Sequence, residues 1–255
     1  MSEQKTFVKK IAMYQLCIDQ GNSRTKVGVF NDNVLVDTFV YDTIDPQIVS
    51  ELQVRFEFDG CILSSVIGYN NLLIDFLRKS FHNLVLLDQN TALPVHVLYK
   101  TPQTLGKDRL AAVVGASYLQ PGADLLVIDA GTAITYDFVD AHRNFHGGNI
   151  APGIEMRLRA LHEFTQKLPL VKAEKDSPLL GTDTQSAILS GVLHGIVFEI
   201  NGYIDALKFK YPELLVFLTG GSTFYFDRKL KNAIFAEKNL VLIGLNRIYQ
   251  YNVQK

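Results

Sequence analysis

The chain has 255 residues, enough for one large or two small domains, since a domain takes about 150 residues. Its 25 Lys and Arg residues against 26 Asp and Glu residues give a formal net charge of −1, and this balance argues against general electrostatic binding of nucleic acid or an anionic membrane. Two cysteines alone cannot form a disulfide framework or a structural zinc site. The first ten residues lack the apolar core of a signal peptide, and no uninterrupted apolar run reaches the ~18 residues of a spanning helix. We therefore expect a cytoplasmic protein with no nucleic-acid and no membrane partner.

The first half of the chain predicts a strand meander followed by alternating helix and strand. Short apolar segments indicate three strands, over residues 14–19, 25–30 and 34–40. Asp45 and Pro46 supply an N-cap and a first-turn proline for a helix that ends near Arg55. A buried strand, an amphipathic helix and another strand follow, over residues 61–66, 69–81 and 83–87. The dozen residues before the first strand are expected to form a flexible arm.

The same order begins again after residue 124. Strands are predicted over residues 125–131, 132–139 and 145–150, helices over residues 154–164 and 184–208, then a strand over residues 214–220 and a helix after Gly221 and Ser222. Asp19 and Asp129 each end the first strand of their half. The duplication predicts an α/β fold of two ribonuclease H-like domains, each a mixed sheet with flanking helices, that face each other across a nucleotide cleft. We place the domains at residues 1–120 and 121–255.

The turn after the first strand has the residues of a phosphate-binding hairpin. It comprises Asp19, Gln20, Gly21, Asn22, Ser23, Arg24, Thr25 and Lys26. Gly21 lets ligand oxygens approach the main chain closely, and Asn22, Ser23 and the backbone amides can donate hydrogen bonds to phosphate. Lys26 adds a positive charge, and the Asp19 carboxylate suits a hydrated Mg²⁺ beside the phosphates. Standing alone, these residues would fit an ordinary hairpin turn about as well.

A second copy of the pattern favours a nucleotide site. Residues 129–135 again place Asp129, a glycine and the Thr132 hydroxyl between a buried strand and a returning strand. Two such hairpins, facing each other, could hold a nucleotide triphosphate from both sides. A third glycine cluster, residues 218–222, lies between a predicted strand and a predicted helix, where backbone amides and the helix N-terminus could meet a nucleotide. Alone, this third cluster would be an ordinary strand-to-helix turn.

The three turns resemble the two phosphate motifs and the adenosine motif of the actin, sugar-kinase and heat-shock ATPase superfamily. Within it, nearly the whole chain resembles the type III pantothenate kinases. The resemblance is carried by Asp19, Gly21, Asn22 and Lys26, by residues 106–109 with Tyr99 seven residues upstream, and by residues 129–135 and 147–153. Ser23 replaces the family's Thr and keeps the hydroxyl. Asp183 replaces an Asn before Thr184 and adds a negative charge that could weaken binding of an anionic substrate.

The resemblance implies transfer of the γ-phosphoryl group of ATP to the primary hydroxyl of pantothenate, the first step of coenzyme A biosynthesis. It makes Asp108 the catalytic proton acceptor, and because the transition state of phosphoryl transfer is loose, the larger task of Asp108 is to orient the hydroxyl. The residues implied for pantothenate are Tyr99, Gly106, Lys107, Asp108, Arg109 and Thr184. Those implied for ATP are Asp19, Gln20, Gly21, Asn22, Ser23, Arg24, Thr25, Lys26 and Thr132.

The resemblance also implies two cations and a homodimer. Asp19 would hold Mg²⁺ through water, and Asp129 would help to bind a monovalent cation, K⁺ or NH₄⁺. The alternative for Asp129 is a second carboxylate near the Mg²⁺. Family members are homodimers whose substrate pocket lies at the subunit interface. Part of the apolar stripe on the long helix predicted from residue 184 would then be core and part would be interface.

Several alternatives remain open at this point. The same fold and nucleotide site could serve another small alcohol, although Tyr99 and residues 106–109 argue against this. The chain could instead be a regulatory ATP-binding protein, because some relatives of these kinases are described as accessory factors in transcription; the pair Asp108 and Arg109 favours an enzyme. Arg109 could also form a salt bridge with Asp108 or Asp129. The six histidines lack metal-ligand spacing and are expected to be structural or exposed.

Overall fold

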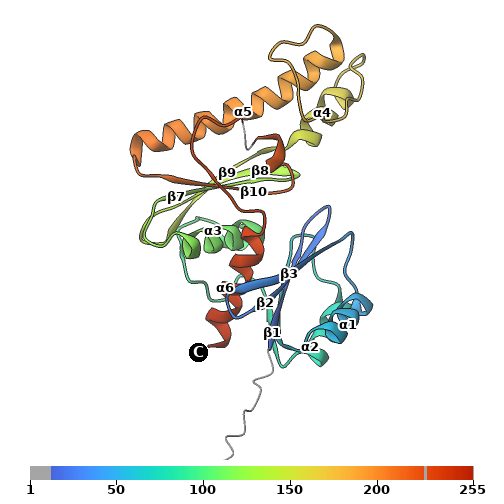
Figure 1. Cartoon of the computed structure of the whole chain (residues 1–255), viewed down its shortest axis with the longest axis vertical. Coiled ribbons are helices and arrows are strands. Elements are labelled where there is room, and N and C mark those ends of the chain that lie inside the picture. The colour runs from blue at the N-terminus through green and yellow to red at the C-terminus, as the bar shows by residue number, and fades with distance from the viewer. Residues whose placement is uncertain (1–12, 227–228, 255) are drawn as a thin grey trace, which may run out of the picture.

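The computed structural model describes residues 13–226 and 229–254, so the expected N-terminal arm lies outside the described residues. The described chain forms two mixed sheets. Helices lie between the sheets and on both outer faces (Figure 1). The layers therefore run from outer helices to the first sheet, to central helices, to the second sheet and to outer helices again.

The first sheet has the strand order β3-β2-β1-β4-β5. Its strands are β1 (Tyr14–Gln20), β2 (Thr25–Asn31), β3 (Val34–Tyr41), β4 (Phe58–Ser65) and β5 (Asn83–Leu86). The first three pair in antiparallel fashion, and β4 and β5 extend the sheet in parallel. Two helices, α1 (Pro46–Arg55) and α2 (Asn71–Ser80), make the connections. The Asp45 side chain caps α1 by accepting a hydrogen bond from the Ile48 amide at 2.9 Å, which confirms the predicted start.

The second sheet repeats the pairing scheme of the first. Its order is β11-β10-β7-β8-β9-β6, so β9-β8-β7-β10-β11 corresponds to β3-β2-β1-β4-β5. Its strands are β6 (His96–Val97), β7 (Leu125–Ala130), β8 (Ala133–Val139), β9 (Asn144–Pro152), β10 (Leu215–Thr219) and β11 (Phe235–Ala236). Antiparallel pairs again join the meander, and parallel pairs join β10 to β7 and to β11. The predicted duplication and fold class are confirmed.

Alternating side chains of the central strands divide the core into separate layers. In β1, Cys17 faces the helices between the sheets, whereas Leu16 and Ile18 face α1 and α2. The central layer holds α3 (Lys107–Leu119) and α6 (Leu240–Val253), which cross closely (Figure 1). A Cβ at Gly244 would overlap the carbonyl of Ala111, so glycine is required at this crossing. The sequence analysis did not predict α6.

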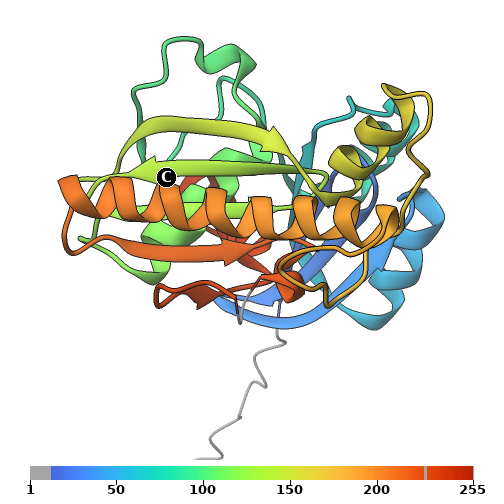
Figure 2. The ribbon, with the colours of Figure 1, turned by 90° about the horizontal axis from the view of Figure 1, so that it is seen from above.

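The outer face of the second sheet is covered by α4 (Ile154–Glu163) and α5 (Thr184–Lys210), and Figure 2 shows α5 lying over the sheet. By length and composition alone α5 could cross a membrane, with a mean hydropathy of 1.4 over its most apolar window. In the structure 56% of that window is buried in the protein. Packing against the second sheet therefore accounts for the apolar sequence of this helix.

The prediction of a helix after Ser222 is wrong. The structure has a 3₁₀ turn, Thr223–Tyr225, in its place. Another short 3₁₀ turn, Pro102–Thr104, occurs earlier in the chain. Phe226 ends the turn with a side chain that is fully buried against the second sheet, which redirects the chain instead of letting a helix continue. The division at residues 120 and 121 stays a prediction: β6 pairs with the second sheet, and α6 returns to pack against β1, β2 and β4.

Candidate functional site

A cleft of ≈ 880 Å³ lies where the central strands of both sheets end. Residues from both halves of the chain line it, and α4 adds polar and apolar side chains at one side. The predicted residues that line the cleft are Asp19, Gly21, Asn22, Ser23, Arg24, Lys26, Asp108, Asp129 and Thr132. The cleft is thus built from the two repeated hairpins and from the first turn of α3.

The two hairpins meet across this cleft. In each, the glycine amide donates a hydrogen bond within its own turn, from Gly21 to the Arg24 carbonyl at 3.1 Å and from Gly131 to the Ala133 carbonyl at 3.0 Å. Between the hairpins, Ser23 Oγ lies 3.2 Å from Thr132 Oγ1. Residues more than one hundred positions apart therefore present hydroxyls and backbone amides to the same space, as a phosphate chain requires.

Two further glycines hold the second hairpin in place. Gly220 has a φ of +99°, and a Cβ there would overlap Asp129 Oδ1 and the Ala130 carbonyl. Two residues later, the Ser222 amide donates a hydrogen bond to the same carbonyl at 2.9 Å. Gly153, from the predicted motif at residues 147–153, donates to the Thr132 carbonyl at 3.1 Å. The third glycine cluster thus closes on the hairpin through a tight turn, without a helix N-terminus.

Negative charge is concentrated in the cleft. Burial, together with the charges of Asp108 and Asp129, raises the pKa of Asp19 to about 7, while Lys26 opposes the shift. Burial and the charges of Asp108 and Asp137 raise the pKa of Asp129 to about 6, again opposed by Lys26. Oδ1 of Asp19 is buried and has no hydrogen-bond partner among the described residues. A cation bound here would both occupy that oxygen and relieve the repulsion.

The donor set fits a cation that keeps most of its water. Within the described ranges, no group of three His, Cys, Asp or Glu side chains lies close enough together to enclose a metal ion. Mg²⁺ commonly binds through one or two carboxylates, several waters and the phosphates of a nucleotide. The unpartnered Asp19 oxygen beside the phosphate-binding hairpin suits that kind of site.

Arg109 is committed to a partner that the sequence analysis missed. Its Nε donates to Asp137 Oδ1 at 2.9 Å and to Oδ2 at 3.1 Å, and its Nη2 also bonds to Oδ1. Arg109 is 6% exposed and Asp137 1%. Neither of the two salt bridges considered as alternatives for Arg109, with Asp108 or Asp129, is formed. The sequence did contain one signal of this ion pair. Asp137 is an acidic residue in the largely buried strand β8, and a buried carboxylate needs a cation beside it.

Tyr99 completes a cluster with this ion pair. The guanidinium carbon of Arg109 lies 5.6 Å from the centre of the Tyr99 ring, which stacks on Phe145. Gly147 and Gly148 make room for the cluster: a Cβ at Gly147 would lie 2.9 Å from the Tyr99 ring, and one at Gly148 would lie 2.7 Å from Asp137 Oδ1. Tyr99 and Arg109, both predicted for the substrate pocket, are thus brought together with Asp137.

Some predicted residues do not line the cleft; they are Gln20, Thr25, Tyr99, Gly106, Lys107, Arg109 and Thr184. Gln20 and Thr25 are buried and pair with each other at the base of the first hairpin. Lys107 donates a hydrogen bond to the Tyr69 hydroxyl at 3.1 Å and lies over the Tyr69 ring. Thr184 is exposed at the start of α5, next to the Asp183 cap.

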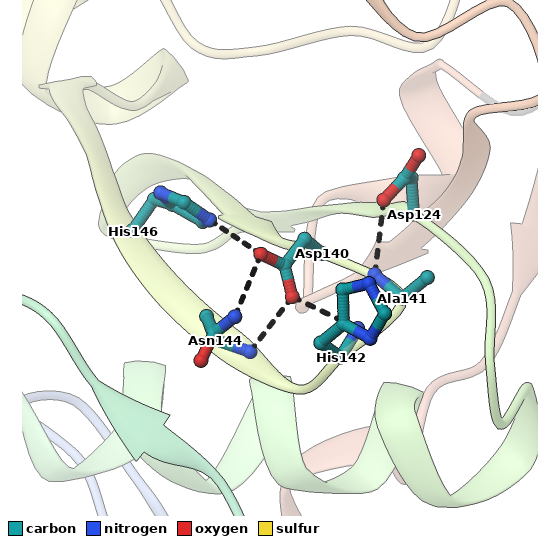
Figure 3. A network of polar contacts seen from close by, with 6 residues as sticks. All are labelled: Asp124, Asp140, Ala141, His142, Asn144 and His146. Atoms are coloured by element: carbon teal, nitrogen blue, oxygen red, sulfur yellow. Dashed lines mark hydrogen bonds and ion pairs between the residues drawn. The ribbon is translucent and has the colours of Figure 1, made fainter.

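His142, in the turn between β8 and β9, and His146, in β9, belong to a hydrogen-bond network that stabilises this turn. Figure 3 shows the Asp140 carboxylate bonded to His146, to Asn144 and to the backbone amide of His142. Although burial opposes it, these hydrogen bonds lower the pKa of Asp140. The turn lies outside the residues that line the cleft. This agrees with the expectation that His142 and His146 are structural.

Solved structures identify the fold of the protein. A ROK family glucokinase from Streptomyces griseus, in complex with glucose and AMPPNP, matches with a TM-score of 0.52 at 12% identity, over 95% of this chain and 100% of the other. A protein from Campylobacter jejuni described as a conserved putative Baf family transcriptional activator matches with a TM-score of 0.60 at 24% identity, over 94% and 100%. The chain therefore has the two-domain fold of the actin and sugar-kinase superfamily.

Sequence comparison then identifies the family. The family model of the type III pantothenate kinases matches residues 15–206. A type III pantothenate kinase of Bacteroides fragilis is 52% identical over 240 residues, and one of Phocaeicola vulgatus is 51% identical over 237 residues; each match covers 93% of this chain and 98% of the relative. The chain belongs to the type III pantothenate kinase family, and the resemblance stated from its motifs is confirmed.

Proposed function

We propose that this protein phosphorylates pantothenate with ATP and a divalent metal ion, in the first step of coenzyme A biosynthesis. The observation that carries the proposal is the meeting of the two hairpins, with Ser23 Oγ 3.2 Å from Thr132 Oγ1, in a cleft that Asp108 also lines. Membership of the pantothenate kinase family supports the choice of acceptor. Like its relatives, which are enzymes of bacterial metabolism, the protein is proposed to act in the cytoplasm.

The hairpins bind and orient ATP. Backbone amides and the hydroxyls of Ser23 and Thr132 donate hydrogen bonds to the phosphates, and Lys26 supplies a positive charge in a cleft that Arg24 also lines. Asp19 holds Mg²⁺ through water, and this ion, when bound, neutralises part of the phosphate charge. Asp129 holds the monovalent cation. Gln20 and Thr25 act indirectly, because their pairing supports the hairpin from below.

Asp108 acts on the acceptor. It lies in the first turn of α3, where its carboxylate can accept a hydrogen bond from the pantothenate hydroxyl, orient it toward the γ-phosphorus and receive its proton late in the transfer. Arg109 follows it in the buried cluster with Tyr99 and Asp137. Arg109 bonds to Asp137 through Nε and Nη2 and also hydrogen-bonds to Tyr99, and its remaining N–H donors can serve an anionic group of the substrate.

Release of ADP from ATP and Mg²⁺ tests the proposed function. It should depend on pantothenate and should be measured with and without pantothenate, in K⁺ buffer and again in Na⁺ buffer. Pantothenate-dependent turnover that collapses without K⁺ would support the kinase and its monovalent cation together. ATP binding with no turnover on pantothenate, in either K⁺ or NH₄⁺, would exclude the proposed reaction and leave another acceptor or a regulatory ATP-binding protein.

The variant Asp129→Ala tests the monovalent cation site. We expect that K⁺ no longer stimulates the variant, because Asp129 supplies the half-buried carboxylate in the cleft for that cation. Initial rates over a K⁺ titration at constant ionic strength measure the effect. Asp75→Asn, an exposed carboxylate on α2, serves as the control that keeps wild-type stimulation. If Asp129→Ala responds to K⁺ as the wild type does, Asp129 does not hold the cation.

The ligand-free protein should become less stable as pH rises. The folded-state pKa of Asp19, about 7, lies above its ordinary value of 3.8, so the folded protein binds this proton more tightly than the unfolded chain does. The stabilisation that comes from this protonated carboxyl is fully present below about pH 4 and is lost as pH rises to about 7. The difference in unfolding free energy between Asp19→Asn and wild type should therefore shift in favour of the variant by up to about 4 kcal/mol from pH 4 to pH 8.

Urea denaturation in EDTA at the two pH values measures this difference. Asp75→Asn is again the control and should show little change, because its carboxylate is exposed beside Arg78. An Asp19→Asn variant whose stability relative to wild type is the same at pH 4 and pH 8 would contradict the assignment of a destabilising buried charge to Asp19.

We also propose that the protein is a homodimer that packs through α5. Gly191, Gly195 and Gly202 share one face of this helix, and a Cβ at any of them would meet no atom within 4 Å. Phe198 lies on the same face and is 61% exposed. A helix surface of glycines beside an exposed aromatic ring lets another helix approach closely. Thr184, at the start of α5, would then act in a pantothenate pocket at the subunit interface.

The variant Gly195→Arg tests this interface. Because the position is open in the subunit, the fold should tolerate the side chain, whereas a charged group between two packed helices should prevent association. Light scattering after gel filtration should give the mass of a monomer, with unchanged far-UV circular dichroism. The matched control is Val54→Arg on α1, where the side chain is 88% exposed, and it should remain dimeric. A dimeric Gly195→Arg would contradict packing through this face.

A further inference from the structure

A second cavity, of ≈ 300 Å³, lies at the opposite end of α3 from Asp108. It is bounded by the last turns of α3, by α6, by the segment before β6 and by the turn between β8 and β9. None of its lining residues lines the catalytic cleft. Along α3, Asp108 and Ser117 are separated by about 13 Å at 1.5 Å per residue, so the two spaces are distinct sites.

The cavity carries uncompensated positive charge. Arg143 and Arg247 line it, and none of its described lining residues is acidic. Arg247 donates from Nη1 to Asn33 Oδ1 and to Gln250 Oε1, which are both neutral acceptors. The Arg143 side chain has no hydrogen-bond or ion-pair partner within the described ranges. Two guanidinium groups with free donors therefore face a space without a counter-charge, an arrangement that attracts an anion.

A buried hydroxyl also points to a ligand. Ser117 is 6% exposed, it lines the cavity, and its Oγ has no hydrogen-bond partner in the described part of the chain. Buried polar atoms normally have hydrogen-bond partners. An unsatisfied hydroxyl beside two arginines therefore indicates that a bound group is its partner. Arg247 is held in place, with its guanidinium carbon 4.2 Å from the centre of the Tyr118 ring, and backbone hydrogen bonds to Asp140 and His96 fix the turn that carries Arg143.

We propose that this cavity binds a small organic anion. Arg143 and Arg247 pair with its phosphate or carboxylate group, and Ser117 Oγ donates a hydrogen bond to it. The remaining walls are apolar, with Pro94, Val95 and Val114 among them, so the body of the ligand is apolar and small. A volume of ≈ 300 Å³ is at the lower end of the range of small-molecule sites.

Titrations with phenyl phosphate and with benzoate, followed by backbone amide chemical shifts, test this proposal. The catalytic cleft is first saturated with Mg²⁺ and a non-hydrolysable ATP analogue, and ionic strength is held constant. We expect saturable shifts at residues 117, 118 and 143 with at least one anion and none with neutral benzyl alcohol. The more tightly bound anion identifies the charged group. Shifts that are confined to other residues, or that rise linearly without saturation, would overturn the proposal.

Two variants make the test specific. Arg143→Gln and Ser117→Ala should each weaken binding about tenfold or more, because each removes a hydrogen bond to a charged group. Arg143 is exposed and its side chain has no partner among the described residues, so its loss should leave the fold intact. Arg78→Gln, an exposed arginine on α2, is the matched control and should bind as the wild type does. Wild-type affinity in both Arg143→Gln and Ser117→Ala would exclude the site.

Discussion

Replacement of Asp108 by Asn is expected to lower kcat by about 10²–10⁴-fold, the usual contribution of a positioned general base. The amide keeps the size of the side chain but cannot accept the proton of the pantothenate hydroxyl, and it orients that hydroxyl less well. Affinity for ATP should not fall, because Asp108 adds negative charge to a cleft that already contains Asp19 and Asp129. The effect should therefore appear in turnover rather than in nucleotide binding.

The measurement combines steady-state ADP release with calorimetric titration of ATP and Mg²⁺. Thermal unfolding checks that the variant is folded, and Asp75→Asn shows the effect of the same chemical change at an exposed site. Near-normal turnover in Asp108→Asn would remove Asp108 from the role of proton acceptor. The chemistry would then depend on the hairpins alone, since phosphoryl transfer relies largely on positioning and electrostatic stabilisation.

Replacement of Asp137 by Asn is expected to cost about 3–5 kcal/mol of unfolding free energy, because it leaves the buried Arg109 guanidinium without its counter-charge. The same change should raise KM for pantothenate. Asp137 fixes Nε and Nη2 of Arg109, and without it the guanidinium loses the orientation that presents its remaining donors to the substrate. Urea denaturation gives the first quantity, and steady-state kinetics with varied pantothenate gives the second.

A double variant separates structure from binding. Arg109→Met with Asp137→Leu removes both charges from the buried site, so it should recover much of the lost stability, as apolar replacements of buried ion pairs often do. Binding of pantothenate should not recover, because the donor for its anionic group is gone. If Asp137→Asn loses less than about 1 kcal/mol, the ion pair is not buried as the structure describes. If the double variant binds pantothenate normally, Arg109 has no role in the substrate pocket.

Local patterns were sufficient to predict most of the secondary structure. Helix α1 begins and ends where its N-cap and periodicity indicate, because Asp45 caps it through a contact only three residues away. The prediction of a helix after Ser222 was wrong for the opposite reason. There, burial of Phe226 in the core of the second sheet outweighs the local preference, and a 3₁₀ turn results. Helix α6 was missed although its packing against α3 joins the layers of the protein.

The sequence by itself determined the duplicated order of strands and helices, the three glycine turns and the family, because these depend on residue types at fixed short spacings that local backbone geometry requires. Only the tertiary structure decided which distant groups meet. It brought Ser23 to Thr132 and gave Arg109 the partner Asp137. It also assembled the second cavity from separate segments. The physical reason is that burial and charge pairing act across the packed layers, where separation along the chain carries no information about distance in space.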